Sequence, residues 1–173
     1  MELACEKLYK VISEMKVIMR KQFIKQFKLI NENFNKVFNE LFQGGRAELI
    51  LTDEENILES GIEVEVQPPG KKLQNMMLLS GGERAFTAIA LLFSILKLKP
   101  TPFCILDEIE SSLDDANVYR FAEYIRGFSN KTQFVMVTHR KGTMESCDTL
   151  YGVTMQEHGI SKIISMKMDE KAG

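Results

Sequence analysis

Residues 103–108 read FCILDE, four apolar residues followed by two acids. A short run of this kind predicts a buried strand that ends at the acids. A second, mostly apolar run, QFVMV at residues 133–137, is followed by Thr138 and His139. Because helical patterns alternate with these runs, we expect an α/β fold with a mostly parallel sheet flanked by helices. In such sheets ligands bind beyond the carboxyl ends of the strands, so the sequence predicts a polar site there.

The residues that follow these two strands suggest hydrolytic chemistry. Asp107 can hold Mg²⁺ through the ion's water ligands, and Glu108 can orient or deprotonate an attacking water. The alternative is a solvated loop after a strand, because adjacent acids are common. His139 follows the neighbouring strand, which favours the same crevice as Glu108, although a lone histidine is more often a structural residue.

Ser80-Gly81-Gly82-Glu83 opens a strongly apolar segment, residues 82–98, that predicts a helix. One interpretation is a capping box, in which Ser80 and Glu83 satisfy the free amides of the first turn. The glycines fit that interpretation poorly, because glycine weakens a first helical turn. They fit better if an anion approaches bare backbone N–H groups at the positive end of the helix dipole. We therefore favour a phosphate site.

The first forty-odd residues predict one long helix that stops at Gly44-Gly45. Between residues 23 and 41 apolar residues recur every three or four positions, which predicts a core helix. The preceding half is polar on most faces, so we expect it to pair with a helix outside the domain. The remaining expected elements are strands 46–52, 62–67, 149–154 and 160–166 and helix 118–128.

The composition is that of an ordinary globular protein. The 173 residues are 45% hydrophobic and 27% charged, with a net charge of −2, so no global basic field indicates nucleic acid. Three scattered cysteines exclude a disulfide framework and a CxxC metal site. With no secretion signal and no apolar run long enough for a bilayer, we expect a cytoplasmic protein without a membrane partner.

Four motifs, in this order and spacing, resemble those of ATP-binding-cassette ATPases. LSGGER at residues 79–84 resembles the signature motif, and residues 103–108 resemble the Walker B strand with its catalytic glutamate. Residues 112–114 (SLD) resemble the D-loop, and His139 resembles the switch histidine. The combination is far more specific than any one of the motifs.

More narrowly, the chain is similar to the C-terminal head half of a bacterial SMC chromosome-maintenance protein. The long helix and residues 41–48, 67–73 and 138–144 carry this resemblance. It implies a coiled-coil end and head-entry helix at residues 1–42, followed by the C-terminal half of an ABC-type ATPase head at residues 43–173. The family usually has Asp at Glu110 and Ala at Ser111, and we expect neither departure to disable the site.

The motif GxxxxGK[ST] does not occur in the sequence. In the SMC family this P-loop belongs to the N-terminal half of the head, beyond a long coiled coil and a hinge. The resemblance therefore implies that the N-terminal half is a partner of this chain. Without that half, this chain would be inactive.

The resemblance also implies the roles of the residues after the two strands. Asp107 would coordinate Mg²⁺, and Glu108 would position and activate the attacking water. His139 would contact the γ-phosphate of ATP and hold that water's geometry.

A second SMC head, giving a homodimer, is implied as a further partner. Ser80, Gly81 and Gly82 would bind the γ-phosphate of ATP held by that opposite head, and Asp114 would reach across the same interface. The cycle of engagement and hydrolysis would drive chromosome condensation and segregation at the nucleoid, with DNA and a bridging kleisin subunit as further partners.

Two other classes of protein remain as alternatives. One is a RecN-like or other SMC-like DNA-repair ATPase, which shares the same motifs. The other is a non-enzymatic docking module for a kleisin or for DNA, which the missing P-loop favours. A transporter nucleotide-binding subunit fits poorly, because a helix and a hairpin precede the signature here in place of a P-loop and a helical subdomain.

Overall fold

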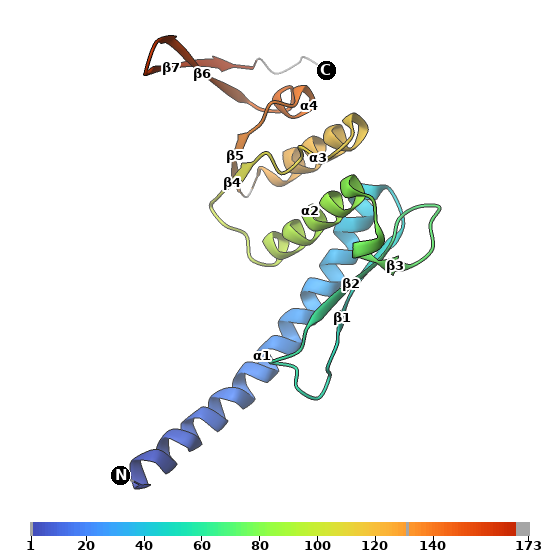
Figure 1. The fold of residues 1–173 in the computed structure, drawn as a ribbon, viewed down its shortest axis with the longest axis vertical. Helices are drawn as coiled ribbons and strands as arrows, with labels where there is room; N and C mark the ends of the chain where they lie inside the picture. The colour runs from blue at the N-terminus through green and yellow to red at the C-terminus, as the bar shows by residue number, and fades with distance from the viewer. Residues whose placement is uncertain (1, 131, 169–173) are drawn as a thin grey trace. The chain divides into compact units, whose positions relative to one another are not determined.

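A single uninterrupted helix, α1 (Glu2–Phe42), begins the protein. The computed structural model describes residues 2–130 and 132–168, which fall into two compact units, Met1–Pro100 and Thr101–Gly173 (Figure 1). Helix α1 ends at Phe42, inside the first unit, and the boundary between residues 42 and 43 stays a prediction. Within the described residues, no helix is long and apolar enough to cross a membrane.

The two ends of α1 have different surroundings. Its last turns are buried in the core of the first unit through Phe34, Val37, Phe38 and Leu41. The earlier part extends beyond the strands that pack on the helix (Figure 1) and leaves apolar side chains in solvent. These exposed side chains are Leu8, Tyr9, Val11, Ile12, Met15, Val17, Ile18, Met19 and Ile24. The predicted long helix is confirmed, with full burial beginning at Phe34.

Helix α1 ends at a turn whose backbone conformations favour glycine. Gln43, Gly44 and Gly45 all have positive φ, and a Cβ on Gly45 would lie 2.2 Å from the carbonyl oxygen of Gln67. Any larger residue at position 45 would therefore push the following strand away from its neighbour. The sequence predicts that the two glycines stop the helix, and in the structure the chain also turns back along it there.

The strands of the first unit form an antiparallel sheet in the order β1-β2-β3. Its bounds are β1 (Arg46–Leu51), β2 (Ile62–Gln67) and β3 (Gln74–Asn75). The outer edge of β1 is satisfied by side chains of α1: Asn31 Oδ1 accepts from the N–H of Leu49 (2.8 Å), and Asn35 Oδ1 accepts from the N–H of Ala47 (3.0 Å). The helix therefore takes the place of a further strand at this edge.

A short 3₁₀ turn, η1 (Met76–Leu78), leads into α2 (Gly81–Leu98). Helix α2 packs against α1 (Figure 1), with the rings of Phe42 and Phe86 4.8 Å apart between centroids. Phe86 and Phe93 are fully buried. The predicted apolar helix is confirmed. Residues 79–84, which resemble the signature motif, lie at its start in the first unit.

In the second unit the two predicted apolar strands pair in parallel. β4 (Phe103–Asp107) and β5 (Gln133–Val137) run in register, with Asp107 opposite Val137. They are connected through α3 (Asp115–Phe128), whose apolar face contributes Val118, Phe121, Ala122 and Ile125 to the core. The four-residue helix α4 (Lys141–Met144) follows β5 and packs on α3. The βαβ pattern thus brings both carboxyl ends to one edge.

The mostly parallel sheet predicted for this half is seen only in the β4–β5 pair of the described residues. β6 (Thr149–Glu157) and β7 (Ile160–Lys167) form a separate antiparallel hairpin. The turn at His158 and Gly159, with φ +83° at Gly159, reverses the chain and allows only antiparallel pairing. A parallel arrangement would require a much longer crossover.

Candidate functional site

Glu108 has an unusual backbone at the end of β4. Its φ is +47°, in the left-handed region that non-glycine residues seldom adopt. The N–H of Glu108 donates to the carbonyl oxygen of Val137 (2.9 Å), so the turn is anchored to the end of β5. Such conformations cost about 1–3 kcal/mol and are concentrated at active sites. The conformation sets Glu108 apart from an ordinary solvated loop.

His139 lies beside this glutamate. Its Nδ1 is 3.3 Å from Glu108 Oε1, and the two side chains are 64% and 53% exposed. The residues come from the carboxyl ends of adjacent parallel strands, and the proximity expected from the sequence is therefore observed. Because both groups are open to solvent, the contact stabilises the fold little and leaves both side chains accessible.

Asp107 occupies the last position of β4 and is exposed. Within the described part of the chain its carboxylate makes no hydrogen bond or ion pair. Mg²⁺ prefers hard oxygen ligands and usually keeps several waters, so a single open carboxylate at a sheet edge fits the ion. Groups of three or more potential ligands are absent from the described residues, so Asp107 does not belong to a metal cage built by this part of the chain.

A buried acid, Glu110, was not among the predicted site residues. It is 1% exposed, and its Oε1 accepts hydrogen bonds from the hydroxyls of Thr138 (2.5 Å) and Thr143 (3.0 Å). Its other oxygen, Oε2, is buried without a hydrogen-bond partner in the described part of the chain. The only sequence signal was that Glu110 and Ser111 depart from the usual family residues.

Asp114 has a clear structural role. It is the N-cap of α3: its Oδ1 accepts from the N–H of Asn117 (2.8 Å) and its Oδ2 from the Asn117 side chain (2.9 Å). Sequence reasoning assigned it only to an interface between heads. The exposed cap and an interface contact are compatible, because the carboxylate lies at the surface.

Ser80 and Glu83 form the capping box that the sequence suggested. The Ser80 hydroxyl accepts from the N–H of Glu83 (3.4 Å), and Glu83 Oε2 accepts from the N–H of Ser80 (3.3 Å). Lys71 Nζ lies 2.8 Å from Glu83 Oε1. The hydrogen bond from Lys71 holds the pKa of Glu83 below its ordinary value; burial opposes this, and the bonds from Ser80 add to it.

The capping box does not explain the glycine at position 81. A Cβ added to Gly81 would meet nothing within 4 Å, so packing within the chain does not require glycine there. Residues of higher helix propensity would be accommodated in this first turn. The open space beside the Gly81 Cα, at the start of α2, is consistent with the approach of an anion.

The predicted site residues fall into two groups. Asp107, Glu108, Asp114 and His139 lie in the second unit, where β4, β5 and α3 position them. Ser80, Gly81 and Gly82 lie in the first unit at the start of α2. Among the described site residues of the second unit, the side chains of Glu108 and His139 are in direct contact.

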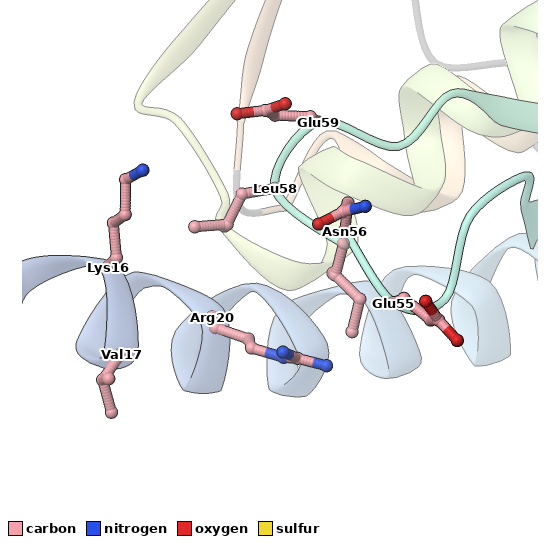
Figure 2. Close-up of a pocket in the computed structure, with 8 residues that line it drawn as sticks. Lys16, Val17, Arg20, Glu55, Asn56, Leu58 and Glu59 are labelled. Atoms are coloured by element: carbon pink, nitrogen blue, oxygen red, sulfur yellow. The ribbon is translucent and has the colours of Figure 1, made fainter. Parts of the chain in front are cut away.

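A groove of about 260 Å³ lies elsewhere in the first unit, between α1 and the loop that connects β1 to β2. Figure 2 shows this loop alongside the helix. Its lining residues are Lys16, Val17, Arg20 and residues 55–59. None of the predicted site residues lines this groove, so it is separate from the acid–histidine pair.

Residues 7–162 match the family model described as "RecF/RecN/SMC N terminal domain". The chain therefore belongs to the RecF/RecN/SMC family. Among curated relatives, "Chromosome partition protein Smc" of Bacillus subtilis (strain 168) is 62% identical over 163 residues. That match covers 94% of this chain but 14% of the relative, so the chain spans about one seventh of the relative's length.

Solved SMC head structures are also similar to the chain. A Smc head domain with an extended coiled coil, bound to the C-terminal domain of ScpA and derived from Pyrococcus furiosus, is 40% identical with a TM-score of 0.81. The match covers 94% of this chain and 40% of that one. A chain from work described as ATP-driven dimerization and DNA stimulated activation of SMC ATPases is 41% identical, with a TM-score of 0.78 and coverage of 85% and 89%.

Proposed function

We propose that this chain is the C-terminal half of an SMC ATPase head that hydrolyses ATP when a P-loop half and a second head complete the site. The observation that carries the proposal is the pairing of Glu108 and His139, 3.3 Å apart, at the ends of parallel strands. The backbone of Glu108 has a positive φ, which is costly for a residue other than glycine and is concentrated at active sites.

One similar solved structure and one exposed sheet face support the assignment to one half of a head. It covers 89% of one solved SMC chain, so a polypeptide of similar extent occurs in an SMC structure. The β4–β5 pair leaves Phe103, Ile105, Val135 and Val137 exposed, and a sheet face of this kind needs covering. We assign the missing cover, together with the P-loop, to the N-terminal half.

Within the assembled head the chain's own residues would prepare the attack of water on the γ-phosphate. Glu108 would accept a hydrogen bond or a proton from the water, and His139 would orient that water against the phosphate. Asp107 would hold Mg²⁺, which neutralises phosphate charge when bound. Most of the rate enhancement in phosphoryl transfer comes from such positioning and charge stabilisation, so an incomplete site would be inactive.

The signature segment would act on the nucleotide of the other head. Ser80, Gly81 and Gly82 form the start of α2, and the space that a Cβ on Gly81 would occupy is open. Asp114 would contact the same interface from the start of α3. In this arrangement ATP joins two heads and hydrolysis separates them. The description of one similar structure, ATP-driven dimerization of SMC ATPases, agrees with this arrangement.

The biological role would be chromosome partition. The curated relative at 62% identity carries that name, which favours this role over DNA repair. A kleisin partner is supported by the similar Pyrococcus furiosus head, which is bound to ScpA. DNA is supported by the description of DNA stimulated activation in a similar SMC ATPase.

The proposal is tested by adding the P-loop half of the same head. The chain alone should bind Mg·ATP only very weakly and hydrolyse none, since it has neither the phosphate-binding loop nor the Walker lysine. Titration calorimetry and a phosphate-release assay are compared for the chain, the P-loop half and their mixture. Turnover in the mixture alone supports the proposal. Micromolar ATP binding by the chain alone would contradict it, as would an inactive mixture in which the halves associate.

A further inference from the structure

Glu110 is the most deeply buried acid of the second unit that the proposed mechanism does not use. One residue, Ile109, separates it from the turn at Glu108, and it is 1% exposed. Desolvation of a carboxylate is costly unless hydrogen bonds compensate. Here all of the compensation reaches one oxygen, because Oε2 has no partner in the described part of the chain.

Both donors to Glu110 belong to the segment that carries His139. Thr138 immediately precedes the histidine and donates at 2.5 Å, and Thr143, in α4, donates at 3.0 Å. The Thr138 hydroxyl also accepts from the N–H of Arg140 (3.0 Å). The Thr138 hydroxyl therefore holds the turn around His139 and binds this turn to Glu110 at the same time.

A second contact closes the same turn from its other side. The Arg140 guanidinium donates to the carbonyl oxygen of Ser111 (3.3 Å) and to Asp115 Oδ1 (2.9 Å). The residues on both sides of His139 are thus fastened to the segment that follows Glu108. The contact between His139 and Glu108 is itself solvent-exposed and contributes little to holding the pair together.

We propose that Glu110 is a positioning residue that, through the Thr138 hydroxyl, sets the distance and orientation of His139 relative to Glu108. The inference rests on the proposed function for its catalytic consequence, whereas its geometric part concerns this chain alone. Without the hydrogen bond between Thr138 and Glu110, the histidine turn keeps the contacts of Arg140 with Ser111 and Asp115. His139 then samples positions that no longer hold the attacking water.

The test uses variants that remove or keep single hydrogen bonds. Thr138→Val removes the hydroxyl with little change of shape, and Thr138→Ser retains it. Glu110→Leu removes the acceptor, whereas Glu110→Gln retains an acceptor oxygen without the charge. Thr143→Val is the matched control, because it removes the other hydroxyl bound to the same oxygen without touching the His139 turn.

The first readout is NMR of the imidazole groups, with the 173-residue chain labelled at histidine and mixed with unlabelled P-loop half. The chain has two histidines, and His158, in the β6–β7 turn, serves as the internal reference. We expect the His139 resonances to move or broaden in Thr138→Val and Glu110→Leu, and to stay in place in Thr138→Ser and Glu110→Gln. His158 should not change in any variant.

The second readout is ATP turnover by the same mixtures. We expect Thr138→Val to lower kcat at least tenfold with an unchanged KM for ATP, because nucleotide affinity comes from the P-loop half. Thr138→Ser should remain within twofold of the parent, and Thr143→Val should keep kcat while lowering thermal stability. The proposal is overturned if folded Thr138→Val keeps both the parent His139 resonances and the parent kcat. An inactive parent mixture would refute the proposed function, and the NMR comparison would still decide the positioning role.

Discussion

The backbone N–H of Glu108 donates to the carbonyl oxygen of Val137 at 2.9 Å, although Glu108 itself lies outside the strand in a left-handed conformation. The hydrogen bond continues the β4–β5 ladder by one step beyond Asp107. It fixes the Cα of Glu108 to the neighbouring strand, while the positive φ turns the chain away from the sheet. A fixed backbone beneath an accessible carboxylate is a property expected of a general base, which must lie within hydrogen-bond reach of the proton it accepts.

Replacing Glu108 with Gln tests its role as that base. Gln keeps the size and shape of the side chain but cannot accept the proton from water. In the assembled head we expect ATP binding to persist and hydrolysis to fall by orders of magnitude, so engaged head dimers accumulate. Single-turnover hydrolysis and size-exclusion chromatography with ATP measure the two effects. Turnover at the parent rate would show that another group is the base.

A pair of variants at the same position measures the backbone strain. Glycine adopts positive φ freely, whereas alanine carries the steric cost of a Cβ, about 1 kcal/mol. We therefore expect Glu108→Gly to be more stable to urea than Glu108→Ala by about that amount, although both lose hydrolysis. Equal stability of the two, or greater stability of the alanine variant, would show that φ at position 108 relaxes at no cost.

Substitutions of Ser80 separate its capping role from a role at the head interface. Ser80→Ala removes the N-cap hydroxyl of α2 and should cost about 1 kcal/mol of stability. Ser80→Arg places a bulky side chain where the opposite head's phosphate must approach, so head engagement and hydrolysis should be abolished. ATP binding to the P-loop half should survive. A folded Ser80→Arg head that no longer binds ATP would instead indicate that the signature acts on its own head's nucleotide.

Lys71→Met tests the ion pair between Lys71 and Glu83 at the start of α2 through the pH dependence of stability. The folded-state pKa of Glu83 is lowered, so as the pH falls below its ordinary value of about 4.5 the unfolded chain takes up the proton first. The pair's contribution is therefore complete at neutral pH and is lost as the pH falls through the folded-state pKa. We expect Lys71→Met to lower stability at pH 7 by at most about 1 kcal/mol, because the lysine is 48% exposed.

The measurement for Lys71→Met is the urea midpoint from pH 7 down to pH 3. The difference between parent and variant should shrink as the pH falls below about 4.5. Lys72→Met is a matched control, since within the described residues Lys72 makes no ion pair. A difference that stays constant to pH 3 would assign the effect of Lys71 to packing of its aliphatic chain.

Local patterns predicted the elements that position the site. The apolar runs at residues 103–106 and 133–137 are short and bounded by polar residues, so their assignment as strands needed no tertiary information. The order of strand, helix and strand then brought Glu108 and His139 to one edge. Their proximity was expected from this order, whereas the side-chain contact itself was seen only in the structure.

The burial of Glu110 was beyond sequence reasoning. It follows two exposed acids closely, and three acids among four residues indicate a solvated loop. The hydroxyls that bind it in the buried site belong to Thr138 and Thr143, which lie 28 and 33 residues away in the chain. The β6–β7 hairpin was missed for a different reason: both strands were predicted, but the short turn between them at His158 and Gly159 was not used to set the direction of pairing.

The hydrogen bonds between Asn31 and Leu49 couple rotation of α1 to rotation of β1. The Asn31 amide both donates to and accepts from the Leu49 backbone, as a paired strand residue does, and Asn35 adds a third bond one turn later. A roll of α1 by one residue, about 100°, would break all three bonds together. We therefore expect a twist of the exposed part of α1 to rotate the β1–β2 hairpin together with the helix.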